Sequence, residues 1–402
     1  MVGRRQRQPR IGARRRGRAG RAAVSAAAVA LDDVSGARRH GRRPPLPPTQ
    51  LPRPSPRPSP PSSSPRRRAR PPAVLVAVRA TLDVVPAAFA LLGAARDGLA
   101  SRLRARRAAR DALLAALAAA AAAGAAASLW LNAAIAAKVE AVVGAPGPAG
   151  VSRASAAVAD ADLASLPPPV ARYLRYALPR GSRLLTRVRL RQVGVFRFRI
   201  QTGLRAGEGW KKVAAVQHAA ALPLRPPGYV WAATVWLAPG LWVRGWDAYA
   251  GGRGHMFWRV LSALPLISSA APEIDQSALL RYLTEAVYYP TALLPSPGLS
   301  WTPVGEHAAR ATLTAGPGSP TVAAVFHFGP GGEALCAKTE DRARPLEDGS
   351  VVSDAHTVEY SRWATDPATG IRYPSRLTMT WDLLRPFPYG KLDVVEYSAW
   401  EA

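Results

Sequence analysis

Alternation of apolar and charged residues between Leu184 and Ile200 is the feature that most limits the fold. The even positions are mainly apolar, whereas arginine recurs at the odd positions. A period of two indicates one buried and one exposed face, which is typical of antiparallel sheet. Gly194 interrupts the series, and we expect it at a bulge or turn. The arginine face either is solvated and discourages edge pairing or meets an anionic surface or lipid headgroups, and we favour the first interpretation. The arginines are Arg183, Arg187, Arg189, Arg191, Arg197 and Arg199.

Further strand-like runs follow at short spacing and are separated by glycine and proline turns. They are 210–222, 228–237, 241–249, 256–261, 308–313, 321–328, 335–339, 351–363, 376–383 and 392–398. Many short strands with such turns are typical of a sandwich, barrel or half-barrel. Two helices interrupt them, at Val170–Ala177 and Ser277–Val287. We therefore predict a mainly β (α+β) fold, with a curved antiparallel sheet or half-barrel and one or two packed helices.

A run of 26 uncharged residues, 112–137, predicts a helical membrane segment before the sheet. As a helix it reaches about 39 Å, enough for a tilted span across about 30 Å of hydrocarbon. Several arginines precede the run and only Lys138 follows closely, so the positive-inside rule places the C-terminal domain on the non-cytoplasmic side. Small residues recur every four positions and would allow self-association of such helices. They are Ala120, Gly124 and Ser128.

The first 72 residues carry 19 of the arginines and 14 of the 39 prolines, so much of the formal charge of +28 lies there. This composition predicts a disordered tail or an organelle targeting segment for a chloroplast or mitochondrion. Binding of nucleic acid is disfavoured, because no aromatic residue interleaves the arginines to stack on bases. The expected organisation is a tail at 1–72, a helical region at 73–143, a linker at 144–165 and a β-rich domain at 166–402.

Several segments of the β-rich region resemble a bacterial family of unknown function. They include LPPPVARYLRYAL at 166–178, PPGYVWAA at 226–233 and YYPTALLPS at 288–296, of which the YPTALLP stretch is the most specific. The resemblance implies an N-terminal membrane segment followed by a β-rich domain, and it implies no activity. His255 departs from the pattern, since a small polar residue is expected there. The layout of strands and helices is also similar to the half-barrels of lipoprotein-carrier proteins, which is an analogy of fold.

Catalytic signatures are largely missing from the sequence. It contains no HExxH, GxSxG or Walker A motif, and its histidines lack metal-binding spacing, so we expect neither a metal site nor a cofactor. The single cysteine, Cys336, is most simply a small buried residue. Asp247 and Glu285 are weak candidates for a general acid and base. The alternative is that Glu285 pairs with Arg281 one helical turn earlier and that Asp247 caps a turn.

Aromatic residues crowd the strands that follow residue 230. Those expected to line an apolar cleft on the concave side of the sheet are Trp231, Trp236, Trp242, Trp246, Tyr249 and Tyr289. Core filling is the competing interpretation. The leading hypothesis is a membrane-anchored β domain that binds a lipid or another apolar ligand. The alternatives are a membrane-associated hydrolase that uses the carboxylate pair and a structural or assembly module.

Overall fold

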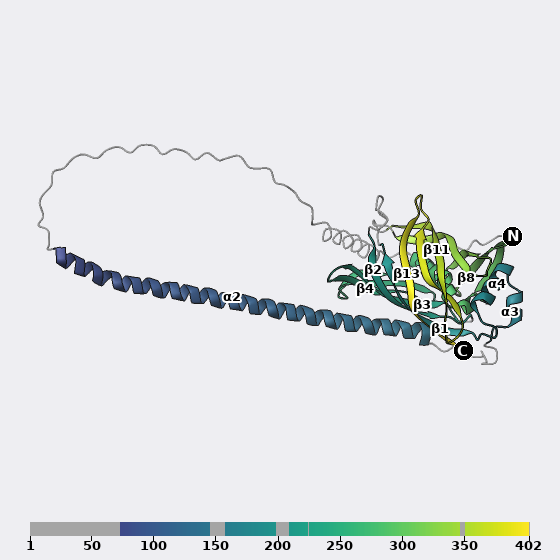
Figure 1. The fold of residues 1–402 in the computed structure, drawn as a ribbon, viewed down its shortest axis with the longest axis horizontal. Helices are drawn as coiled ribbons and strands as arrows, with labels where there is room; N and C mark the ends of the chain where they lie inside the picture. The colour runs from purple at the N-terminus through teal and green to yellow at the C-terminus, as the bar shows by residue number, and fades with distance from the viewer. Residues whose placement is uncertain (1–72, 145–156, 198–208, 224, 346–349, 402) are drawn as a thin grey trace, which may run out of the picture. The chain divides into compact units, whose positions relative to one another are not determined.

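The computed structural model describes residues 73–144, 157–197, 209–223, 225–345 and 350–401, so the tail predicted at 1–72 lies outside the described residues. Its central feature is a 13-stranded antiparallel sheet, curved as a half-barrel (Figure 1). The strands are β1 Leu185–Phe196, β2 Lys211–Ala220, β3 Gly228–Ala238, β4 Leu241–Ala250, β5 Arg253–Val260, β6 Leu264–Ser269, β7 Leu299–Gly305, β8 Ala308–Thr314, β9 Thr321–Phe328, β10 Ala334–Pro345, β11 Val351–Thr365, β12 Arg372–Trp381 and β13 Phe387–Glu401. The predicted fold class is confirmed.

The sheet consists of two halves, β1–β6 and β7–β13, which pair with each other through β1 and β13 at its centre. Its strand order is β6-β5-β4-β3-β2-β1-β13-β12-β11-β10-β9-β8-β7, so all neighbours are adjacent in the chain except β1 and β13. The arginine-rich strand β1 therefore pairs with β2 on one side and with β13 on the other. The first and last strands of the domain close the middle of the sheet, and β6 and β7 form its two edges.

Gly194 is not the bulge or turn that the sequence predicts. It pairs with Leu392 in the ladder, and the register shift between β1 and β13 lies earlier, between Arg191 and Gln192. A Cβ atom at Gly194 would lie 1.9 Å from the carbonyl oxygen of Lys391. This position therefore requires glycine because the backbone of β13 approaches it closely.

Two strands were not anticipated from the sequence, β6 and β7. Both contain a proline, Pro265 in β6 and Pro303 in β7, and both lie at an edge of the sheet. Proline has no backbone N–H to donate to a ladder, so it is tolerated in an edge strand, where that side can face away from the sheet, but not in a central strand. The same prolines make these runs poor strand candidates when only the sequence is considered.

Helices pack on the inner, concave face of the half-barrel. α4 (Pro168–Ala177) contacts β8, β9 and β12, while α5 (Pro272–Glu285) contacts β3–β5 and also β9 and β10. α5 begins five residues before the predicted start because Pro272 occupies its first position, where its missing N–H costs nothing. Since α5 contacts strands of both halves of the sheet, it fills the space between the two halves. The short helix α3 (Asp160–Ala164) precedes α4.

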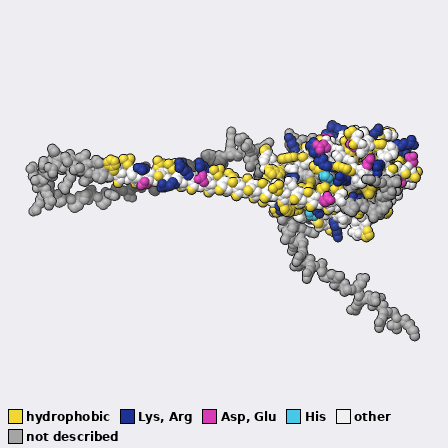
Figure 2. Space-filling view, turned by 90° about the horizontal axis from the view of Figure 1, so that it is seen from below, with side chains coloured by type: hydrophobic (Ala, Val, Ile, Leu, Met, Phe, Trp, Pro, Cys, Tyr) yellow, Lys and Arg dark blue, Asp and Glu magenta, His cyan; other side chains and the backbone are white. Residues whose placement is uncertain are grey.

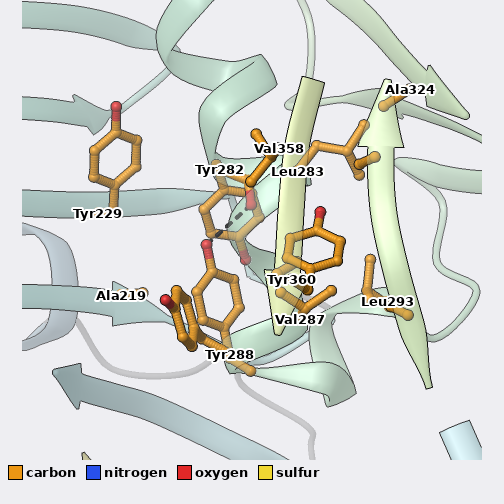
Figure 3. Packing of buried hydrophobic residues seen from close by; sticks show 14 of the residues in the cluster. Ala219, Tyr229, Tyr282, Leu283, Val287, Tyr288, Leu293, Ala324, Val358 and Tyr360 are labelled. Atoms are coloured by element: carbon orange, nitrogen blue, oxygen red, sulfur yellow. Dashed lines mark hydrogen bonds between the residues drawn. The ribbon is translucent and has the colours of Figure 1, made fainter. Parts of the chain in front are cut away.

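Buried tyrosines complete the inner core around α5 and the two 3₁₀ turns that follow it, η3 (Ala286–Tyr288) and η4 (Pro290–Leu293). Figure 3 shows Tyr282, Tyr288 and Tyr360 meeting there from a helix, a turn and a strand. Two of these hydroxyls have backbone partners: Tyr282 donates to the carbonyl of Ala220 at 2.8 Å and Tyr360 to that of Thr284 at 2.6 Å. The expected apolar cleft on the concave side is therefore occupied by helices and tyrosines.

The YPTALLP segment, residues 289–295, has a structural position in this core. Tyr289, Thr291 and Leu293 have no exposed surface. The hydroxyl of Thr291 donates to the carbonyl of Ala221 at 3.1 Å and accepts from the amide of Leu185 at 3.2 Å. The segment thus ties the start of β1 to the end of β2, beneath the centre of the sheet.

On the outer, convex face, the end of α2 (Ala73–Val139) and the π-turn η1 (Glu140–Gly144) pack against the sheet. Leu131 is fully buried there and Val142 nearly so, in a second core cluster with Val230, Trp246 and Ala248. Burying a leucine or valine side chain stabilises by roughly 1.5–3 kcal/mol. The last three turns of α2 are therefore part of the β domain.

α2 is a single helix through the whole predicted membrane segment, and it is shared by two compact units that divide between Ala122 and Ala123. Among the residues that the structure describes, one helix, Phe89–Gly144, is long and apolar enough to cross a membrane, and none of its most apolar stretch is buried. Figure 2 shows arginines gathered in the middle of α2 and hydrophobic side chains along the part that follows. Leu131, which lies within the predicted span of 112–137, packs against the sheet in the second core cluster.

Candidate functional site

A buried ion cluster is centred on Arg281, in the middle of α5. Its Nε donates to Oε1 of Glu285 at 2.8 Å and its Nη1 to Oδ2 of Asp247, on β4, at 3.1 Å. The side chains of Arg281 and Glu285 are only 11% and 4% exposed, and that of Asp247 is 20% exposed. The guanidinium also lies 4.6 Å from the ring centre of Trp231. The structure thus brings together both carboxylates proposed from the sequence, and the predicted Arg281–Glu285 pair is present.

All four carboxylate oxygens of this cluster accept a hydrogen bond. The Trp258 indole donates to Oδ1 of Asp247 at 2.9 Å, and the Gln217 amide donates to Oε2 of Glu285 at 2.8 Å. Arg281 occupies the remaining two oxygens. Asp247 therefore does not cap a turn. With every oxygen engaged, the arrangement supports a structural role that fastens α5 to β2, β4 and β5.

The electrostatics of the cluster reflect burial and ion pairing. Burial raises the pKa of the Asp247 carboxyl, and the Arg281 guanidinium opposes this shift. Burial also disfavours charge on Arg281, but Glu285 and Asp247 outweigh that effect and raise its pKa. A raised pKa is typical of a general acid, yet here each of the four carboxylate oxygens already accepts a hydrogen bond from within the cluster.

A second buried polar group connects β10, β11 and β13. Nη1 of Arg342 donates to Nε2 of His356 at 2.8 Å, and the Tyr389 hydroxyl lies 3.0 Å from the same nitrogen. Burial and the Arg342 charge hold the pKa of His356 well below its usual range, so this imidazole is neutral. A neutral ring accepts from the guanidinium, which makes this a hydrogen-bonded cluster and not a protonated switch.

An open groove of about 580 Å³ lies on the outer face, across β12, β13, β1, β2 and β3. Val193, Val195 and Ala214 form part of its apolar lining together with the exposed ring of Trp236. The basic side chains of Lys212 and Lys391 also line it, as does the Arg376–Asp393 ion pair. Its volume falls within the range of small-molecule sites, roughly 300–1,000 Å³. An apolar wall beside amines suits a ligand that is apolar with an acidic end.

A second cavity, of about 320 Å³, lies below the ends of β2 and β8. Leu222, Pro227 and Tyr282 are among its lining residues. It is the smaller of the two cavities.

The six aromatic residues expected to share a cleft do not share a face. Trp231, Tyr249 and Tyr289 belong to the filled inner core, and the Trp231 indole donates to Gln192 at 2.9 Å. Trp246 is on the outer face beneath the end of α2, where its ring stacks on Phe257 at 4.4 Å.

Trp236 and Trp242, the other two, remain partly accessible. The Trp242 indole donates to the hydroxyl of Ser262 at 3.3 Å. Of the six, only Trp236 lines the larger groove, where it is 43% exposed. The candidate ligand site therefore keeps one predicted residue and adds Val193, Val195 and Lys212, which sequence reasoning missed.

A signal for the missed residues exists in β1. Arginine occupies positions 187, 189 and 191 on the outer face, but positions 193 and 195 on the same face are valines. A break from charged to apolar residues on a solvent-facing strand marks apolar surface left open or covered by a partner. The groove lies at this break.

Among the residues that the structure describes, no group of three or more His, Cys, Asp or Glu side chains is placed to hold a metal ion. His255 accepts a hydrogen bond from the Trp246 indole at 3.2 Å. Burial raises the pKa of the Cys336 thiol, which reduces its nucleophilic thiolate form at neutral pH.

Comparisons with known proteins give one family match and one weak structural similarity. A family model described as a family of unknown function, DUF6544, matches residues 156–392. Among solved structures, the chain is weakly similar to a putative outer membrane lipoprotein-sorting protein domain from Vibrio parahaemolyticus, with 8% identity and a TM-score of 0.28. That match covers 53% of this chain and 85% of the other. No curated protein matches the chain.

Proposed function

The chain belongs to DUF6544, a family of unknown function, and we propose that it is a membrane-anchored β half-barrel that binds a lipid or another apolar ligand in its outer groove. The groove itself is the observation that carries the proposal. It offers apolar surface at Val193, Val195 and Trp236, next to two amines that pair with no carboxylate in the part of the chain that the structure describes. An acyl chain with an acidic headgroup matches this pattern.

The anchor is α2. None of its most apolar stretch is buried, and leucines such as Leu113 and Leu117 are more than half exposed. A membrane would bury this surface at a gain of about 25 cal/mol per Å². Arginines before the apolar stretch favour the orientation with the β domain on the non-cytoplasmic side. Organelle targeting through the N-terminal segment is the alternative location.

Photocrosslinking tests the groove without purification. Membranes that contain the full-length chain are incubated with a fatty acid carrying a diazirine, and the crosslinked peptides are mapped by mass spectrometry. We expect crosslinks on β1, β2 and the end of β3. Ala214→Phe fills the groove and should reduce them about tenfold or more, which corresponds to about 1.4 kcal/mol of binding.

Thr302→Phe is the matched control, because it adds the same side chain at an exposed position of β7, outside the groove. Equal labelling of the wild type and Ala214→Phe, or crosslinks spread over the whole domain, would refute the groove.

Carbonate extraction tests the anchor separately. The wild type should stay in the membrane pellet, and replacement of Leu113, Leu114 and Leu117 by glutamate should release it.

A further inference from the structure

We propose that the outer face of β13 and β1–β5 docks on the surface of an anionic phospholipid bilayer. The inference rests on the proposed membrane anchor, and it extends that function by naming the surface from which the groove takes its ligand. The face is defined by side chains that project to the convex side of these six strands. Its cations are Arg187, Arg189, Arg191, Lys212, Arg244, Arg259 and Lys391.

Cross-strand pairing places these residues on one surface. Arg191 pairs with Val216, which pairs with Ala232, then Trp246 and Phe257 along one row of the sheet. Directly opposed residues point to the same side. Since Trp246 lies in the outer cluster beneath α2, the arginine row lies on that side too. Side chains alternate between the two faces along a strand, so residues two positions away from this row also project to the outer face.

The basic excess on this face is large. Two carboxylates of β13 share it, Glu396 and Asp393. Glu396 contacts both Arg189 and Arg191, at 3.5 and 2.7 Å, whereas Asp393 is held by Arg376 of β12. Exposed ion pairs of this kind contribute little. Within the described residues of these six strands, seven cations therefore share the face with two carboxylates, one of which a further arginine already neutralises. A surface of anionic headgroups is complementary to this charge.

Tryptophans accompany the cations on the same face. Arg187 lies 4.4 Å from the ring centre of Trp400, and Arg259 lies 5.0 Å from that of Trp130. Trp130, Trp236 and Trp400 are 51%, 43% and 38% exposed. Tryptophan with neighbouring arginine is the side-chain combination that favours a membrane–water interface. An exposed aromatic ring would be costly against bulk water alone.

The tether leaves the domain from this face. Leu131 packs against the outer cluster, Asn132 accepts from Arg244 at 2.6 Å, and Trp130 contacts Phe257. The residues just before them, 123–129, are uncharged and belong to the same compact unit. A bilayer that holds the preceding turns of α2 therefore begins next to the basic face. Charge, aromatic residues and the tether all converge on one side of the sheet.

A bilayer accounts for these features better than a nucleic acid does. The exposed tryptophans of this face sit beside guanidinium groups at the margin of the cluster covered by α2, and the groove between the cations is apolar. A polyanion satisfies the charges but leaves the apolar groove and Trp236 in water. A lipid surface satisfies both, and its acyl chains can enter the groove without crossing water.

The test uses the full-length chain in nanodiscs, with Cys336→Ser and a single introduced cysteine that carries a fluorophore. Thr234→Cys reports on the basic face, since Thr234 lies between Ala214 and Arg244 in the ladder. Thr302→Cys, on β7, is the control. Lipids with a quencher on the headgroup measure proximity. We expect strong quenching at Thr234→Cys in discs with about 30% anionic lipid, weak quenching in zwitterionic discs, and reversal by high salt.

Charge variants sharpen the test. The triple variant Arg187→Glu, Arg191→Glu and Lys212→Glu should abolish the lipid-charge dependence, whereas Arg187→Lys with Arg191→Lys should retain it. The lysine variant keeps the charge, so its loss of docking would overturn the proposal. Quenching that ignores headgroup charge, or that is equal at the control label, would overturn it as well. Circular dichroism establishes that each variant folds.

Failure of the anchor gives a different result from failure of the face. If carbonate releases the wild-type chain, the anchor is refuted, and sedimentation of that released chain with added vesicles still measures the face. Tenfold stronger binding to anionic than to zwitterionic vesicles supports docking, and equal binding refutes it. Release from anionic vesicles by equimolar DNA phosphate would assign the face to nucleic acid and overturn the bilayer as its partner.

Discussion

Replacement of Arg281 by methionine tests the structural interpretation of the buried ion cluster. Methionine keeps much of the side-chain volume and removes the charge that both Glu285 and Asp247 share. The two carboxylates would then remain buried on the inner face. Each keeps one neutral donor, Trp258 or Gln217, and neither keeps a cation within the cluster.

The expected loss in the free energy of unfolding follows from the burial of the two carboxylates. Breaking a buried ion pair by removal of one partner costs about 3–5 kcal/mol. Asp247 is 20% exposed and both carboxylates retain a hydrogen bond, so we expect the lower end, about 3 kcal/mol. Arg191→Met is the control, since Arg191 and Glu396 are both nearly half exposed. Such a pair contributes at most about 1 kcal/mol.

The loss should depend on pH in a defined direction. Burial already raises the pKa of Asp247 above its ordinary value of 3.8, and removal of Arg281 would raise it further. A carboxyl whose pKa is higher in the folded than in the unfolded state binds more protons when folded, so acid favours the folded state. The deficit of Arg281→Met should therefore be complete at neutral pH and shrink as the pH falls through the folded pKa.

Urea unfolding of the full-length chain in detergent, followed by tryptophan fluorescence at several pH values, measures both effects. A midpoint equal to that of the wild type, or equal losses for Arg281→Met and Arg191→Met, would refute the structural role of the cluster. A deficit that does not shrink in acid would refute the electrostatic explanation.

Three further results are expected. Gly194→Ala should cost about 1–3 kcal/mol, because a Cβ there meets the Lys391 carbonyl at 1.9 Å; a urea midpoint unchanged from wild type would contradict this. Trp246→Ala should cost about 3–5 kcal/mol and release the end of α2, seen as faster amide exchange around Leu131, which it packs near; unchanged exchange would contradict it. Alkylation of Cys336 should be slower than that of a free thiol at neutral pH, since burial raises its pKa and lowers its thiolate fraction; a rate equal to that of a free thiol would contradict this.

The sheet was predictable from the sequence because its strands obey a local rule. The alternation in β1 and the turns between later strands depend on neighbours in the chain, and β9 matches its predicted bounds, 321–328. The edge strands β6 and β7 were not predicted, because their prolines are tolerated only at the edge of a sheet and the sequence does not show which strands lie there. Gly194 was misread because its neighbour, Lys391, is far away in sequence.

The site was less predictable for the same reason. A list of tryptophans does not say which face each one occupies, since a face depends on register, and adjacent residues of one strand point to opposite sides. Trp231 and Trp246 fell on opposite faces of the sheet. The pairing of Glu285 with Arg281 was predictable because it spans one helical turn, but the contact with Asp247 joins distant elements.

α2 has two roles, as the proposed membrane span and as part of the outer cluster, and each role limits the residues left for the other. The uncharged run of 112–137 has the length of a tilted span. Its last turns pack against the sheet, however, beginning with Leu131, which is fully buried. The residues left, 112–130, reach about 29 Å as a helix, which barely matches about 30 Å of hydrocarbon. A span without spare length has little room to tilt. The stretch of chain between this span and the basic face is short, because Asn132 already contacts Arg244 of that face. A short link in the sequence raises the effective concentration of the basic face near the headgroups, which favours their contact.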